Sequence, residues 1–255
     1  MLPFFTLTWM LAFARISAML MIFPAFSSAS FPVRLRVALA AVLAYLISLP
    51  LPSMTVASLG LNSIIGLLAV EISIGVLLGF VSRMVFFAVE SAGHIIATEM
   101  GLMMTAEFDP FNSSRTDAPS TMLAFLAITL FFSADMHHWF LMGLQRSFDF
   151  LPIGAAHLNS ETVTDVLAHS SRIFTQATLL AAPLIAVSFV INIVSSVLGR
   201  AVPQINVFVE SFAFRIMAGL VVFGLTLELM AQHILNWLRN VPDDFLRVAQ
   251  LLGAH

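Results

Sequence analysis

The chain has 255 residues, of which 60% are hydrophobic and 10% are charged, whereas about a quarter of the residues in soluble domains are charged. This composition excludes an ordinary soluble globular protein. It predicts an all-α integral membrane protein with about six long hydrophobic helices, because a backbone in lipid must satisfy its own hydrogen bonds. The net charge of −3 argues against a nucleic-acid partner, and the absence of cysteine excludes disulfides and thiolate metal sites.

The first apolar run, Leu2–Phe23, is long enough to span a bilayer and lacks a basic leader and a small-residue cleavage site, so we expect a retained first helix. Arg15 interrupts this run. Since an arginine facing lipid at the bilayer centre costs at least about 2.5 kcal/mol, we expect Arg15 to face other protein groups. A turn-rich stretch and a shorter apolar run, Val37–Leu51, follow.

The third apolar run, Leu61–Val81, contains Gly75-x-x-x-Gly79, a spacing that lets two helix backbones approach closely. Glu71 lies in the middle of this run. A lone carboxylate there indicates either a proton or ion relay, or a structural partner for a group on a neighbouring helix. Because no series of further carboxylates accompanies Glu71 or Arg15, we predict that both are structural and that each has an oppositely charged or hydrogen-bonding partner.

Beyond Arg83 the pattern predicts an amphipathic helix, with Glu90 and His94 four residues apart on one face. Two such side chains suggest a metal site, but no H-E-x-x-H or comparable cluster accompanies them. We therefore interpret Glu90 and His94 as a structural pair.

A long polar loop, residues 106–119, separates two strongly hydrophobic segments. Unpaired backbone groups cannot face lipid, so this loop must lie in water, in an interface or in an aqueous pathway. A loop of this length is a functional candidate, although a surface connector has the same pattern. Its prominent side chains are Glu107, Phe108, Asp109, Pro110, Phe111, Arg115, Asp117 and Pro119.

Two further helices are expected after the loop, one over Thr121–Phe132 and a half-polar one that ends at Leu151. Between them, His137 and His138 precede Trp139, and we interpret the three as an interfacial belt. Adjacent side chains project about 100° apart on a helix, so the two histidines are expected to be poorly placed to bind one metal ion together.

The C-terminal part predicts a helical hairpin. A capping box at Thr162 and Asp165 marks the start of a long helix, and a second apolar run covers Val207–Trp237. Between the helices lies a tip rich in helix breakers and hydrogen-bonding side chains, made of Gly199, Arg200, Pro203, Gln204 and Asn206. After Asn240 we expect a new cap and an amphipathic stripe that docks on a membrane surface or a partner, formed by Phe245, Val248 and Leu252.

Five segments resemble one family in their sequence and order: AGHIIATEMGL, FDP, FFSADMHHWFL, SFDFLPIG and GRAVPQINVFVESFAFRIMAG. Over nearly its whole length the chain is similar to the FliR/SctT family of type III secretion export-gate proteins. The HHWFL and SF-x-x-LP segments look more like the flagellar branch. The chain departs from the family pattern at Glu210, Ala213 and Arg215.

The resemblance implies a subunit of the flagellar export gate in the bacterial inner membrane, at the basal body. The implied partners are homologues of FliP, FliQ, FlhB and FlhA, membrane lipid, and unfolded flagellar export substrates. The implied regions are a FliP-like N-terminal part (1–158), a FliQ-like hairpin (159–240) and a tail (241–255). In the family the loop at 106–119 resembles a plug beneath the closed exit. Packing between subunits would also bury and pair the charges expected to be structural, which are Arg15, Glu71, Glu210 and Arg215.

Three alternatives remain: the injectisome counterpart SctT, an independent secondary transporter, and an intramembrane enzyme. Glu71 suggests a transporter, but the sequence has no two-half internal repeat of the kind that many transporters carry. For an enzyme we find neither a paired nucleophile and base nor a metal signature, so we expect no catalytic, cofactor or metal site. Co-purification with two other small hydrophobic proteins would distinguish the gate subunit from the transporter and the enzyme.

Overall fold

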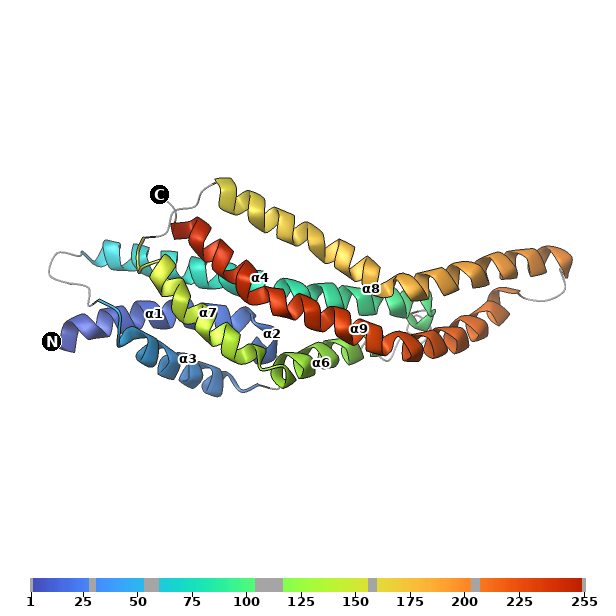
Figure 1. The fold of residues 1–255 in the computed structure, drawn as a ribbon, viewed down its shortest axis with the longest axis horizontal. Coiled ribbons are helices and arrows are strands. Elements are labelled where there is room, and N and C mark those ends of the chain that lie inside the picture. The colour runs from blue at the N-terminus through green and yellow to red at the C-terminus, as the bar shows by residue number, and fades with distance from the viewer. Residues whose placement is uncertain are drawn as a thin grey trace. The chain divides into compact units, whose positions relative to one another are not determined.

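The structure, a computed structural model, describes residues 2–27, 31–52, 60–103, 117–155, 160–202 and 207–253. Over these residues it contains helices and no strand (Figure 1). The helices are α1 (Leu2–Ile22), α2 (Pro24–Ser27), α3 (Val33–Ser48), α4 (Leu61–Glu99), α6 (Ala118–Ser133), α7 (Met136–Phe150), α8 (Ser160–Ala201) and α9 (Val207–Gly253). Three of them, α4, α8 and α9, are long and apolar enough to cross a membrane, and α6 with α7 passes the same test as one bent pair. The prediction of an all-α membrane protein is confirmed.

Helix α4 is longer than the sequence prediction. It is a single helix of 39 residues, so the amphipathic segment after Arg83 continues the apolar run instead of forming a separate helix. No proline interrupts this stretch, and nothing else in it terminates a helix. At 1.5 Å per residue α4 is about 58 Å long, against a hydrocarbon thickness of about 30 Å, so one bilayer covers only part of it.

Helix α9 also continues past its expected end. The prediction of a cap after Asn240 is wrong, because α9 runs to Gly253 with Pro242 inside it. The stripe of Phe245, Val248 and Leu252 is buried within the chain and is not presented to a membrane or a partner. The Phe245 ring lies 6.0 Å from that of Phe140 on α7, centroid to centroid, so α7 supplies part of this cover.

The chain divides into two compact units. Unit 1 comprises Met1–Met84, Asp135–Ser170 and Arg239–His255, and unit 2 comprises Val85–Ala134 and Ser171–Leu238. The helices α4, α8 and α9 each contribute one end to unit 1 and the other end to unit 2.

In unit 1, α1 packs against two helices. An indole bonds it to α3, and two glycines of α4 allow close contact with α4. Figure 1 shows α1 and α3 side by side, and Trp9 Nε1 of α1 donates to the Ala41 carbonyl of α3 at 3.2 Å. On α4, a Cβ added at Gly75 would overlap the Arg15 carbonyl oxygen, and one added at Gly79 would lie 2.9 Å from the Met19 carbonyl oxygen. The G-x-x-x-G spacing therefore lets α4 lie directly on the α1 backbone.

In unit 2, the second half of α4 packs closely on α6. A Cβ added at Gly93 would overlap the Ser120 backbone, and Ser120 Oγ donates to the Glu90 carbonyl at 3.2 Å. The rings of Phe86 and Phe131 meet edge to face with centroids 6.2 Å apart. Fully buried residues of α4 and α6 in unit 2 include Val89, Ala92, Ile96, Leu123 and Ala127.

Candidate functional sites

Arg15 of α1 and Glu71 of α4 form an ion pair in the core of unit 1. Arg15 Nε lies 2.6 Å from Glu71 Oε2, and both side chains are 0% exposed. Gly75 lies one turn after Glu71 and permits the close approach of α4 to α1 that brings the two charges together. Away from water such a pair interacts strongly, and removing either partner leaves the other as an uncompensated buried charge.

The end of α7 and the turn after it supply further partners of this pair. Arg15 Nη1 donates to the Leu151 carbonyl at 3.0 Å, and the Gly154 N–H donates to Glu71 Oε1 at 3.0 Å. Gly154 has a φ of +80°, a left-handed conformation that glycine adopts without steric cost. The Phe148 ring centroid lies 4.1 Å from Arg15 Cζ, a cation–π contact. The ion pair therefore joins three separate parts of the chain.

A second polar cluster joins the start of α8 to the end of α9 within unit 1. His169 Nε2 lies 2.9 Å from Asp244 Oδ1, and His169 Nδ1 lies 2.8 Å from the Asp165 carbonyl oxygen. Arg247 Nη2 lies 3.0 Å from Asp165 Oδ1. Because His169 and Asp165 are buried or nearly so, these contacts fix the first turns of α8 against the last turns of α9.

This cluster corrects the predicted capping box at Thr162 and Asp165. Helix α8 already begins at Ser160, so Thr162 lies inside its first turn. The buried Thr162 Oγ1 has no hydrogen-bond partner among the residues that the structure describes. Asp165 contacts Arg247 of α9 and His169, one turn further along α8, instead of capping the helix.

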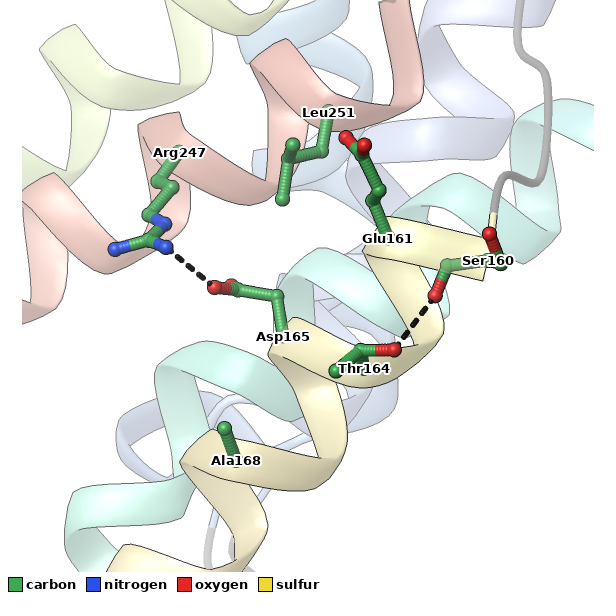
Figure 2. A pocket seen from close by; sticks show the side chains of 7 residues that line it. All are labelled: Ser160, Glu161, Thr164, Asp165, Ala168, Arg247 and Leu251. Carbon is green, nitrogen blue, oxygen red and sulfur yellow. Dashed lines mark hydrogen bonds and ion pairs between the residues drawn. The ribbon is translucent and has the colours of Figure 1, made fainter.

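A cleft of about 450 Å³ lies beside this cluster (Figure 2). Figure 2 shows Asp165 of α8 bonded to Arg247 of α9, with Glu161 directed towards Leu251. Thr164 Oγ1 donates to the Ser160 carbonyl at 2.9 Å, so this hydroxyl is committed to the helix backbone. The cleft thus combines carboxylates with one guanidinium, and its full lining is Ser160, Glu161, Thr164, Asp165, Ala168, Arg247 and Leu251.

In unit 2, Arg215 of α9 donates from Nη2 to Asn192 Oδ1 of α8. A cavity of about 10 Å³ lies beside Arg215 and is also lined by Ser188 and Glu99. Ser188 Oγ and Arg215 Nε are buried and have no hydrogen-bond partner among the described residues. A cavity of this size holds about one water molecule, and a water there could bond to both atoms.

The described end of the polar loop is attached to α4. Asp117 precedes α6, and its carboxylate pairs with His94 Nδ1 of α4. Pro119 lies in the first turn of α6, next to Ser120, which bonds to the Glu90 carbonyl. The structure thus pairs His94 with Asp117, whereas the sequence suggested Glu90 as the partner of His94. The other expected loop residues lie outside the described residues: Glu107, Phe108, Asp109, Pro110, Phe111 and Arg115.

The hairpin tip is described only on its α8 side. Gly199 and Arg200 lie in the last turn of α8, which ends at Ala201, while Pro203, Gln204 and Asn206 lie outside the described residues. Gly199 is helical, and the described glycines with positive φ are Gly101 and Gly154. Gly199 therefore continues α8, and Pro203, with which it was expected to break the helix, lies outside the described residues.

The four charges expected to be structural differ in burial. Arg15 and Glu71 are fully buried, Arg215 is half-buried and Glu210 is exposed in the isolated chain. Burial of Glu210 would therefore require a neighbouring molecule.

Asp135, His137 and His138 cluster at the start of α7. One ligand atom from each lies within 4.8 Å of the others, and the two imidazole centroids are 4.1 Å apart. The expectation that the adjacent histidines diverge is therefore wrong. The angle of about 100° describes the directions in which the side chains leave a helix, and here the rings turn back towards each other. Trp139 beside them is exposed.

Comparisons with known proteins match nearly the whole length of the chain. Residues 6–241 match the family described as bacterial export proteins, family 1. The flagellar biosynthetic protein FliR of Pectobacterium carotovorum subsp. carotovorum is 30% identical over 92% of this chain and 90% of the relative. The protein of the same name from Escherichia coli (strain K12) is 29% identical over 93% and 92%. That from Aquifex aeolicus (strain VF5) is 27% identical over 96% and 93%.

Proposed function

Because the chain belongs to the bacterial export proteins of family 1, we propose that it is a subunit of the flagellar export gate. In this proposal it assembles with FliP and FliQ homologues to form and gate the channel for unfolded export substrates. The observation that carries the proposal is the family match over residues 6–241. The flagellar names of the relatives favour this apparatus over the injectisome counterpart SctT. The membrane would be the bacterial inner membrane at the basal body, where FlhA and FlhB homologues are further partners.

The surface of the hairpin in unit 2 supports assembly with other subunits. Its exposed large apolar side chains are Phe174, Leu179, Phe189, Val190, Ile193, Val194, Val197, Leu198, Phe214, Met217, Leu220, Val221, Leu225 and Leu229. A patch of this extent has to be covered by lipid or by protein. Glu210 is also exposed on this segment, and a charge facing lipid is costly. Neighbouring subunits can supply partners for Glu210, so protein cover is favoured around it.

Affinity purification of this chain after co-expression with FliP and FliQ homologues tests the proposal. We expect both homologues to co-purify, and we expect Arg200→Ala and Glu210→Ala to lower the yield of the complex. Arg146→Ala, at an exposed position of α7, is the matched control. Failure of the unsubstituted chain to retain the homologues contradicts the proposed function, whereas normal yields from both variants contradict only the tip contacts.

We further propose that loop 106–119 is a plug that closes the channel when no substrate passes. Its charged side chains tolerate an aqueous lumen, and Phe108 and Phe111 can fill space. The pair between Asp117 and His94 supports a fixed attachment at one end, which a movable plug requires. Deletion of residues 111–116 should raise ion leakage while secretion continues. A tight and fully functional channel after this deletion would identify the loop as a connector.

The proposed role of Arg15 and Glu71 within the gate is structural. Glu71 is fully buried, and both of its oxygens are engaged, one by Arg15 and one by the Gly154 N–H, as expected of a structural group. Glu71→Gln should therefore reduce assembly of the complex. If this variant assembles normally but abolishes proton-dependent export, the relay hypothesis replaces the structural one.

A further inference from the structure

We propose that Asp135, His137 and His138 form a binding site for one divalent transition-metal ion of the zinc type. This inference does not rest on the proposed function. The three residues belong to unit 1 and come from the start of α7 (Met136–Phe150) and the residue before it. They provide two imidazoles and one carboxylate within 4.8 Å of one another.

The backbone at Asp135 brings the carboxylate to the histidines. Asp135 has φ +56° and ψ +22°, and it is the non-glycine residue with positive φ in the part of the chain that the structure describes. This left-handed conformation is sparsely populated outside glycine, and aspartate is among the residues that adopt it most readily. It places Asp135 Oδ1 3.7 Å from His138 Nδ1, while the ring of His137 lies 4.1 Å from that of His138.

The chemistry of the ligand set selects the class of ion. Imidazole suits Zn²⁺, Cu²⁺ and Ni²⁺, whereas Mg²⁺ and Ca²⁺ prefer sites made of oxygen ligands. Two histidines and one carboxylate are a known three-ligand set for Zn²⁺, with a fourth position left for water. The site therefore fits an open zinc-type centre.

Small side-chain rotations would complete the coordination. Zinc–ligand distances of about 2.0–2.2 Å place tetrahedral ligand atoms about 3.3 Å apart. Because the three ligand atoms already lie within 4.8 Å of one another, no separation has to shrink by more than roughly 1.5 Å. The side chains of His138 and Asp135 are 66% and 75% exposed, and they can rotate without displacing packed groups. Bound metal would tie Asp135 to the first turn of α7 and fix the direction in which that helix begins.

Titration calorimetry of the full chain in detergent, without a polyhistidine tag and with Zn²⁺ as the probe, tests the site. We expect about one Zn²⁺ per chain, and we expect His138→Ala and Asp135→Asn each to weaken binding at least about tenfold. His94→Ala is the matched control, because His94 is an exposed histidine with one carboxylate partner, Asp117. It should leave the zinc affinity unchanged.

A second measurement keeps the test independent of folding. His138→Gln serves this purpose, because position 138 is exposed whereas His137 is half-buried, and circular dichroism checks that the variant keeps the helicity of the unsubstituted chain. Co²⁺ bound to the unsubstituted chain should give the intense visible absorption of four- or five-coordinate cobalt, and His138→Gln should lose it. Zinc affinity that is unchanged in a folded His138→Gln chain overturns the proposal. The absence of saturable zinc binding by the unsubstituted chain overturns it too.

Discussion

Replacing Glu71 with glutamine tests how strongly the buried ion pair stabilises unit 1. The substituted side chain keeps almost the same shape, and its amide oxygen can still accept the Gly154 N–H. Its amide nitrogen, however, takes the place of Oε2, which now lies 2.6 Å from Arg15 Nε. The amide N–H of the glutamine would then face the N–H of Arg15 Nε, and neither group can accept a hydrogen bond. Arginine does not lose its proton under such conditions, so Arg15 would remain charged and buried, and it would still donate to the Leu151 carbonyl.

The size of the effect follows from the charge that remains. Breaking a buried pair by removing one partner costs about 3–5 kcal/mol, and the cation–π contact to Phe148 does not offset this loss, because it is already present in the unsubstituted chain. Adding Arg15→Met to Glu71→Gln removes the buried guanidinium that has lost its carboxylate partner. The double variant should therefore be more stable than Glu71→Gln alone, with a residual cost of about 1–3 kcal/mol for unsatisfied polar groups.

The assay is unfolding of the full chain in mixed detergent micelles, with helicity followed by circular dichroism as the fraction of denaturing detergent rises. Glu228→Gln, an identical change at an exposed position of α9, is the matched control and should shift the free energy of unfolding by less than about 0.5 kcal/mol. If Glu71→Gln behaves like Glu228→Gln, the ion pair does not stabilise the fold. If the double variant is less stable than Glu71→Gln, the unpaired charge of Arg15 is not the cause of the lower free energy of unfolding.

The other predictions use the same unfolding assay. Gly75→Ala should cost about 1–3 kcal/mol through overpacking, because its added Cβ would overlap the α1 backbone. Gly66→Ala on the same helix is the control: its added Cβ would meet no atom within 4 Å, so this variant should be stabilising. Gly93→Ala should destabilise in the same way by forcing α4 away from α6, and equal stability of the Gly93→Ala and Gly66→Ala chains would refute the close packing. His169→Ala should cost about 1–3 kcal/mol, because it removes a buried side chain together with its bonds to Asp244 Oδ1 and the Asp165 carbonyl. Arg247→Ala should cost less than about 1 kcal/mol, because Arg247 is 63% exposed and Asp165 keeps its contact with His169. The reverse order would contradict the assignment of the buried contact.

Much of the helical architecture followed from the sequence, because composition and breaker residues act locally. The apolar runs predicted α1 and the end of α7 before Leu151, where Pro152 cannot continue a helix. The errors lie where tertiary packing overrides a local signal. The cap expected after Asn240 is locally reasonable, but α9 continues through Pro242, and burial of Phe245 against α7 stabilises the extra turns.

The sites were harder to predict because their partners are far apart in the sequence. Arg15 and Glu71 were each recognisable as buried charges, but 56 residues separate them, and periodicity carries no information about which helices meet. Sequence reasoning missed the partners Leu151 and Gly154 because they act through backbone groups. The one available signal was Gly154 two residues after a proline, which is typical of a turn. His169 and Asp244 are likewise 75 residues apart.

The close helix contact and the ion pair contribute in different ways to the packing of α1 on α4. Small residues such as Gly75 and Gly79 allow the backbones to approach. A contact made only by small residues, however, favours the native alignment of the two helices little over an alignment shifted by one turn. The ion pair distinguishes them sharply, since a shift of α1 by one turn, about 5.4 Å, would separate Arg15 from Glu71 and leave two unpaired buried charges. An apolar pair of similar volume could match the stability of the native pair. It would not penalise the wrong register, so the charges contribute more to the specificity of the packing than to its strength.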